Sequence, residues 1–190
     1  MVSDAVVSAM SASFRLCICL SGTDGTLPAL QHELISFCAM NDSQRVDVAE
    51  PSSGTYLGLI SLNQEVTTIA RQSGIPQGLA ELLKIRASQM NGCIHSLQVH
   101  TAESTQSGED RDRLAVLPVW RRSSLFSPLE RAALALTEAI TALPGQDVPP
   151  AIIREARTVL THDQFVAVSW IAVMINSWNR LSMISGRPVS

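Results

Sequence analysis

Aromatic residues are scarce in this chain of 190 residues, at 4 % of the sequence, whereas hydrophobic residues make up 46 %. Small and aliphatic side chains, above all alanine and leucine, therefore have to fill the core. Both residues are strong helix formers, while aromatic residues are among those enriched in strands. No segment alternates convincingly between polar and apolar residues with a period of two. The composition predicts an all-α fold.

A strong charge of one sign is also missing, since the net charge is −3 and the basic residues are scattered. Nucleic acids and anionic membranes attract clustered lysine and arginine residues, so neither is expected as a partner. The sequence contains no glycine-rich phosphate loop, no His-x3-His pair and no paired Cys-x-x-Cys ligand set. We therefore expect no cofactor and no metal.

Long apolar runs are absent. The longest uncharged stretch runs from Gln164 to Asn179, which is short of the roughly 20 residues that a membrane-spanning helix needs.

Cysteines are few for a disulfide scaffold in a helical chain of this size, so a reducing, cytoplasmic setting is the better expectation. The four cysteines are Cys17, Cys19, Cys38 and Cys93.

Residues 1–39 differ from the rest of the chain. They are rich in serine, break at the segment SGTDGTLP and show no sustained helical period. We expect a poorly ordered N-terminal extension over residues 1–39 and one all-α domain over residues 40–190. Met40 is a candidate for the functional start, because helical organisation begins soon after it.

Helical patterns follow one another from about residue 51. One predicted helix has Pro76 in its first turn and ends at Asn91 and Gly92. Another begins with Ser127 and Glu130, which form a capping box. The predicted helices cover residues 52–74 (as two short helices or one broken helix), 76–92, 127–145, 149–160 and 161–184.

Three of these helices have informative faces. In the helix over residues 161–184 the polar residues fall on one side, which predicts a buried helix with one polar stripe. Arg86 lies on the apolar face of its helix, so we expect it to have a carboxylate or carbonyl partner if it is buried. The predicted apolar faces contain Leu79, Leu82, Leu83, Ala87 and Met90 in one helix, and Leu129, Ala132, Ala133, Leu136, Ile140 and Leu143 in another.

Cys93 directly follows the predicted helix end at Gly92, so we place it in the first turn of the next helix. Unpaired backbone N–H groups and the positive end of the helix dipole favour a thiolate at such a position. At about 100° per residue, Ser96 and His100 share one stripe with Cys93, while His95 is predicted to point to the far side.

Glu81 comes level with His100 if the helices before and after Gly92 fold back as a hairpin. A carboxylate beside His100 would orient the ring and raise its basicity, as thiol activation requires. Simpler interpretations stay open: a lone cysteine at a helix end is often inert, and a glutamate in a first turn often only complements the dipole. A zinc site built from His95, His100 and Glu81 is disfavoured, because helical geometry separates the two histidines.

The spacing of these residues resembles a family signature. Glu81, Cys93, position 96 and His100 reproduce the pattern E-x11-C-x2-C-x3-H, with Ser96 in place of the second cysteine. The segment KIRASQMNGC is similar to the RASQINGC stretch of the same family, and LPVWRRSSLFSPLERAALALTEAIT and INSWNRL resemble its later helices. Over roughly residues 45–185 the chain resembles the AhpD-like alkylhydroperoxidase, or carboxymuconolactone decarboxylase, family.

The resemblance implies an AhpD-like helical domain in which a helical hairpin carries the motif. It also implies assembly as a homo-oligomer, either a trimer or a hexamer, and antioxidant peroxidase activity. In the family's peroxidases one cysteine becomes a sulfenic acid, the other closes a disulfide, and Glu and His residues relay the proton. The relay maps to Glu81 and His100, with His95 as a further candidate. Ser96 cannot form a disulfide and is a far poorer nucleophile than a thiolate.

Three functions remain open at this point. In the first, which we favour, Cys93 acts as a one-cysteine peroxidase or thiol oxidoreductase on a hydroperoxide. An external thiol or dithiol, or a cysteine of the extension, then resolves the sulfenic acid. In the second, His100 and Glu81 perform acid–base chemistry in a decarboxylase or isomerase-like enzyme. In the third, the protein is a non-catalytic binding or assembly module.

Overall fold

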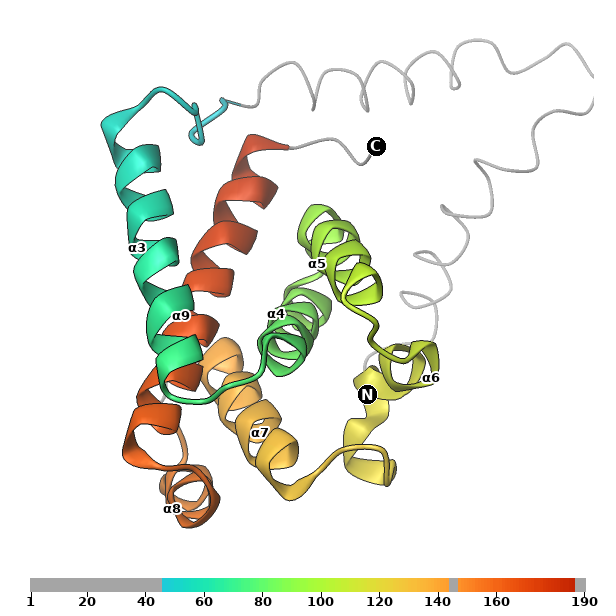
Figure 1. Ribbon diagram of the computed structural model, residues 1–190. Coiled ribbons are helices and arrows are strands. Elements are labelled where there is room, and N and C mark those ends of the chain that lie inside the picture. Colours follow the sequence, from blue (N-terminus) through green and yellow to red (C-terminus); the bar gives the residue numbers. More distant parts are fainter. Residues whose placement is uncertain (1–45, 144–146, 187–190) are drawn as a thin grey trace, which may run out of the picture. The chain divides into compact units, whose positions relative to one another are not determined.

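The computed structural model describes residues 46–143 and 147–186 (Figure 1). Within these ranges the regular elements are all helices and there is no strand, so the predicted all-α fold is confirmed. No helix in the same ranges has the length and apolar character needed to cross a membrane. In chain order the elements are α3 (Gly54–Gln72), α4 (Gln77–Asn91), α5 (Ile94–Gln106), α6 (Arg111–Val116), the 3₁₀ helix η1 (Leu117–Arg122), α7 (Pro128–Ala142), α8 (Pro150–Val159) and α9 (His162–Ser185). The predicted extension over residues 1–39, with its three cysteines, lies outside the described residues.

Helix α4 is the centre of the helical arrangement. It packs against α5, α7 and α9, while α3 lies along α9, and α8 packs on α7 (Figure 1). Leu82 and Leu83 are fully buried, and burying a leucine side chain stabilises a fold by about 2 kcal/mol. Because helices cover α4 on several sides, Glu81 and Ile85, which lie away from the Leu79 and Leu83 stripe, are buried too.

The helix ends follow the sequence signals. The Ser127 side chain accepts a hydrogen bond from the Glu130 backbone, and the Glu130 carboxylate accepts one from the Ser127 backbone. Thr161 and Gln164 form the same capping box at the start of α9. Gly92 ends α4 with φ at 67°, in the left-handed region that favours glycine. The capping boxes and the stop at Gly92 are confirmed.

Four details of the helix predictions are wrong. Residues 54–72 form one continuous helix, α3, because packing along α9 outweighs the weak helix propensity of its glycines. Pro76 is the N-cap of α4 and precedes its first turn. Met90 and Leu143, expected in apolar faces, are exposed because each stands at the end of its helix, beyond the neighbours that cover the rest of the face.

Arg86 has the carboxylate partner that its position demands. Its Nε donates a hydrogen bond to Glu138 Oε1 on α7 at 2.6 Å. The carboxylate of Glu138 also accepts hydrogen bonds from the indole N–H of Trp120, at 2.8 Å, and from Arg121. Burial alone raises the pKa of Glu138, but these donors outweigh it and hold the pKa below its ordinary value of 4.5. One buried carboxylate thus joins α4, η1 and α7.

The predicted polar stripe of α9 contacts α4 through two asparagines. The side-chain amide of Asn91 donates a hydrogen bond to Asn176 Oδ1 at 2.9 Å, and the Ser88 hydroxyl lies 3.1 Å from Asn179 Oδ1. Both asparagines of α9 are buried. These contacts fix the position of α9 along α4, since buried polar groups need their partners at one register.

The variant Glu138→Gln should lower the free energy of unfolding by about 3 kcal/mol near neutral pH, because it leaves the Arg86 guanidinium with no charged partner in this cluster. The folded-state pKa of Glu138 lies below 4.5, so its stabilising contribution is present above that pH and is lost as the pH falls through the folded-state pKa. Urea unfolding of both proteins at neutral and acidic pH should show the difference shrinking with acid. Glu155→Gln, at an exposed position of α8, is the control and should change little. Equal stabilities of the two variants would contradict the prediction.

Candidate functional site

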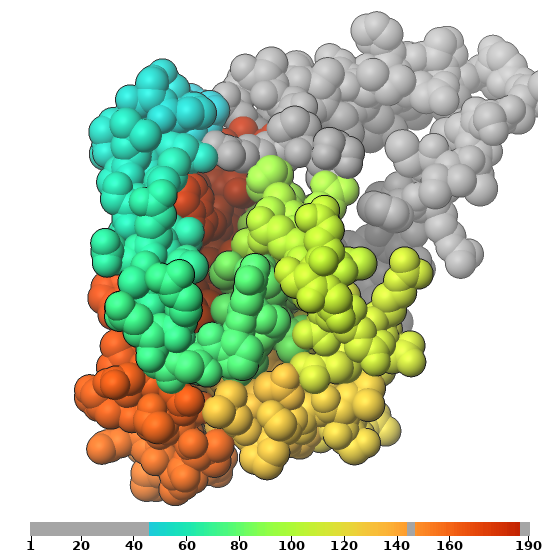
Figure 2. Space-filling model, viewed as in Figure 1, coloured from blue at the N-terminus to red at the C-terminus, as the bar shows by residue number. Residues whose placement is uncertain are grey.

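A cavity of about 540 Å³ opens between α3, α4, α5 and α9. In Figure 2 it is the hollow between the blue-green surface of α3 and the yellow-green surface of α5, with α9 visible behind them. This volume suits a small organic molecule. The lining has two walls. The wall from α3 and α9 is mixed: it contains the apolar residues Val66, Ala70, Ile171, Met174 and Trp178 and the polar residues Asn63, Thr67, Arg71 and Ser182. The wall from α4 and α5 is mostly polar and contains Glu81, Lys84, His95, Ser96, His100 and Glu103.

The polar wall depends on the way α5 folds back against α4. Gly92 allows the chain to turn sharply, and the backbone N–H of Cys93 donates a hydrogen bond to the Ser88 carbonyl at 3.0 Å. The next helix therefore begins with almost no linker. As the hairpin prediction requires, Glu81 of α4 and His100 of α5 meet across the pair, with 2.9 Å between Oε2 and Nδ1.

The carboxylate of Glu81 is held on both of its oxygens. Oε2 contacts His100, and Oε1 accepts a hydrogen bond from Lys84 Nζ at 2.7 Å. Burial alone raises the pKa of Glu81, but the hydrogen bond to His100 and the charge of Lys84 outweigh it, so the pKa lies below the ordinary value of 4.5. An ionised carboxylate only accepts, so Nδ1 of His100 must donate. A neutral His100 then has Nε2 available to accept a proton.

Cys93 lies behind this wall. It is the N-cap of α5 and not a residue of the first turn, which corrects the prediction by one position. Its side chain is a free thiol that is 2 % exposed, and it is not among the described residues that line the cavity. Sγ donates a hydrogen bond to Ser96 Oγ at 3.3 Å. Ser96 itself lines the cavity, so Cys93 contacts a residue of the cavity wall.

The spacing of His95 from Cys93 predicted that His95 points to the far side of α5, and this prediction is wrong. It is half-buried and lines the same cavity as Ser96 and His100. The prediction took Cys93 as the centre of the functional stripe. Cys93 precedes the helix, so its position does not define which face of α5 is turned towards the cavity. His95 lies at the edge of the face that is.

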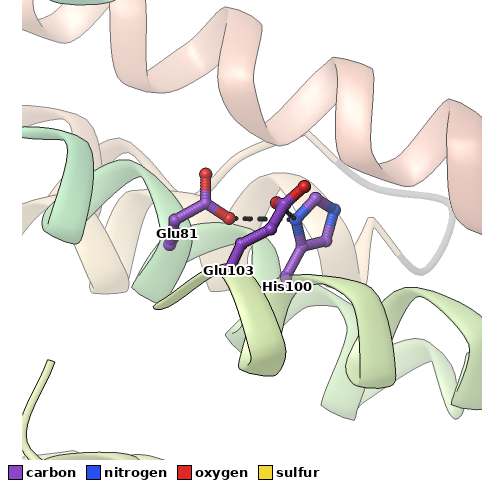
Figure 3. A group of neighbouring side chains, drawn as sticks. All are labelled: Glu81, His100 and Glu103. Atoms are coloured by element: carbon purple, nitrogen blue, oxygen red, sulfur yellow. Dashed lines mark hydrogen bonds and ion pairs between the residues drawn. The ribbon is translucent and has the colours of Figure 1, made fainter. Parts of the chain in front are cut away.

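Two residues of the polar wall were not predicted from the sequence. The Glu103 carboxylate lies 3.0 Å from Nδ1 of His100, on the same edge of the ring as the Glu81 carboxylate (Figure 3). Lys84 binds the second oxygen of Glu81. Both could have been found from their spacing, because Glu103 is three positions after His100 and Lys84 is three after Glu81, and residues three apart are neighbours on a helix.

Comparisons with known proteins identify the family and the fold. The model of the carboxymuconolactone decarboxylase family matches residues 59–139. The uncharacterized protein YdfG of Bacillus subtilis is 36 % identical over 127 residues, which cover 67 % of this chain and 86 % of YdfG. The crystal structure of ATU0492 from Agrobacterium tumefaciens, a protein of unknown function with the suggested name antioxidant defence protein AhpD, has a TM-score of 0.68 and 26 % identity, and covers 77 % of this chain and 99 % of its own. The chain therefore belongs to the carboxymuconolactone decarboxylase family and has the AhpD-like fold.

Proposed function

We propose that this protein is a thiol-dependent peroxidase that reduces an organic hydroperoxide through Cys93. The observation that carries the proposal is the contact between Cys93 Sγ and Ser96 Oγ, because Ser96 lines the cavity that also contains His100 and Glu81. The Ser96 hydroxyl thus links the buried thiol to the cavity, where a substrate would lie beside His100, the proton acceptor. The suggested antioxidant role of ATU0492 supports the same reaction class.

The first half of the reaction oxidises the thiol. The thiol proton passes by way of the Ser96 hydroxyl to Nε2 of His100, whose ring is oriented by Glu81. The thiolate attacks the terminal oxygen of the hydroperoxide, and the O–O bond breaks. The leaving alkoxide takes the proton from His100 and departs as an alcohol, and Cys93 remains as a sulfenic acid.

The second half of the reaction needs an external thiol, because position 96 supplies no sulfur. This thiol attacks the sulfenic sulfur, forms a mixed disulfide and releases water. A second thiol then attacks the mixed disulfide, so that Cys93 returns to its reduced form and the reductant leaves as its own disulfide. Since Cys93 is 2 % exposed, Ser96 has to move aside for each of these reactants.

The cellular setting is part of the same proposal. A supply of reducing thiol fits a cytoplasmic location, and the family resemblance suggests a trimer or hexamer. Exposed apolar side chains on two neighbouring helices support a homo-oligomer, because they would be covered by another subunit. They are Leu57 and Leu62 of α3, and Trp170 and Val173 of α9.

A second function is favoured by one specific observation. His100 and Glu81 line the cavity directly, whereas Cys93 lies behind Ser96. An oriented imidazole in this cavity could move a proton on a carbon acid without redox chemistry, as a decarboxylase or isomerase-like enzyme does. Dependence of turnover on Cys93 separates the two functions.

We predict that Cys93 is oxidised by an organic hydroperoxide to a sulfenic acid. Reduced protein would be treated with cumene hydroperoxide, trapped with a sulfenic-acid reagent and analysed by peptide mass. The Cys93 peptide should carry the label, and His100→Gln should slow labelling by roughly 100-fold, because the variant has lost the proton acceptor. His162→Gln, at an exposed site in the first turn of α9, is the matched control and should label at the wild-type rate. Labelling no faster than that of a free model thiol would refute the redox proposal and favour acid–base chemistry.

The variant Ser96→Cys should form an intramolecular disulfide with Cys93 under mild peroxide. The present Sγ to Oγ distance of 3.3 Å brings the two side chains close enough for small movements to close the bond. Non-reducing peptide mapping would identify the linked peptides, and turnover with a dithiol donor should rise. Val99→Cys is the control, because position 99 is nearly two turns away from Cys93 on the same helix and should give no such disulfide. If Ser96→Cys keeps both thiols free, the side chains do not approach as described.

A further inference from the structure

We propose that Glu81, His100 and Glu103 form a binding site for a divalent transition-metal ion with a preference for oxygen and imidazole ligands, such as Mn²⁺. The site lies on the polar wall of the cavity and draws its ligands from two helices, Glu81 from α4 and the other two residues from α5 (Figure 3). The proposal goes beyond the peroxidase reaction and does not depend on it.

The geometry of the three side chains is the first argument. One ligand atom from each residue, Nδ1 of His100 and a carboxylate oxygen of each glutamate, lies within 4.8 Å of the other two. An ion bound at about 2.1 Å from its ligands holds them about 3.0 to 4.2 Å apart. The two oxygens that approach Nδ1 are already 2.9 and 3.0 Å from it. Glu103, whose side chain is 51 % exposed, has the freedom to make the remaining adjustment.

The count of protons and charges is the second argument. Nδ1 of His100 carries at most one hydrogen, yet two carboxylate oxygens lie at hydrogen-bond distance from it. Glu81 and Glu103 therefore compete for that hydrogen, and their negative charges repel each other. A divalent cation in place of the hydrogen would attract both carboxylates and the ring nitrogen at once.

The surroundings of the cluster suit a bound ion. Lys84 holds Oε1 of Glu81 at 2.7 Å, which leaves Oε2 facing His100 and fixes the carboxylate, while its positive charge offsets one of the two carboxylate charges of the site. The three residues line the cavity, so further coordination positions are open to water or to a small ligand. Two carboxylates with one imidazole suit Mn²⁺, Fe²⁺ or Zn²⁺ better than an alkaline-earth ion or a thiolate-preferring ion.

Binding of an ion has a consequence for the proton relay. The ion takes Nδ1 of His100 and Oε2 of Glu81, which are the two atoms of the hydrogen bond that orients the ring. The ion-bound and hydrogen-bonded states of this pair are therefore mutually exclusive. No metal was predicted from the sequence, because it has no His-x3-His pair and no paired cysteines and because helical geometry separates His95 from His100. The structure places Glu103 beside the ring of His100 instead.

The test is a titration of the chelator-treated full-length protein with MnCl₂, followed by the electron paramagnetic resonance signal of free Mn²⁺ and by calorimetry. Mn²⁺ is the probe because thiols hold it poorly, so the four cysteines of the chain do not interfere. We expect one Mn²⁺ per chain and a higher melting temperature with Mn²⁺ than without it. Glu103→Gln and His100→Ala should each weaken binding by roughly tenfold or more.

Two controls keep the test specific. Glu65→Gln removes an exposed carboxylate of α3, and His95→Ala removes a histidine of the same cavity outside the ligand set; both should bind Mn²⁺ as the wild type does. Glu103→Gln decides the matter if His100→Ala fails to fold, because Glu103 is half-exposed. Absence of binding, or equal affinity in the wild type and Glu103→Gln, overturns the proposal. Weakening by His95→Ala as strong as by Glu103→Gln also overturns it, because the ion would then lie elsewhere in the cavity.

Discussion

The carboxylate of Glu81 is the group on which the polar half of the cavity depends. It is buried in the central helix, and a charge in that place is tolerated only when donors surround it. Lys84 supplies one donor from the same helix, and His100 supplies the other from α5. The need to satisfy one buried charge therefore fixes where α5 lies, which face of it meets the cavity and how the imidazole is turned.

The same helix serves the core on its other side. Arg86, five residues after Glu81, points towards α7, where Glu138 neutralises it. Leucines between these charged residues fill the space between helices. Helix α4 thus carries the buried carboxylate of Glu81 and the partly buried guanidinium of Arg86, each joined to a different neighbour, and the leucine packing holds both at fixed positions. The same packing of α4 therefore stabilises the core and sets the geometry of the cavity.

The two walls of the cavity have different physical roles. The apolar side chains of the α3 and α9 wall include Trp178, whose indole N–H donates to Asn63 Oδ1 at 3.2 Å and whose ring meets Tyr56 edge to face. This wall favours the organic part of a ligand through the hydrophobic effect. The polar wall supplies proton transfer and charge. Cys93 is not among the described lining residues, and its thiol contacts the lining at the hydroxyl of Ser96.

The sequence alone determined the features that depend on neighbours along the chain. The capping boxes at Ser127 and Thr161, the helix end at Gly92 and the helical class of the fold follow from local hydrogen bonding and side-chain entropy. The spacing of Glu81 and His100 about Gly92 also predicted their contact, on condition that the two helices fold back as a hairpin. Only the tertiary structure decided which face of α5 looks into the cavity, that Glu103 joins the pair, and that Cys93 is buried. Those outcomes depend on how α3 and α9 close around the hairpin, because burial and the competition of two carboxylates for one ring nitrogen arise only when separate helices come together.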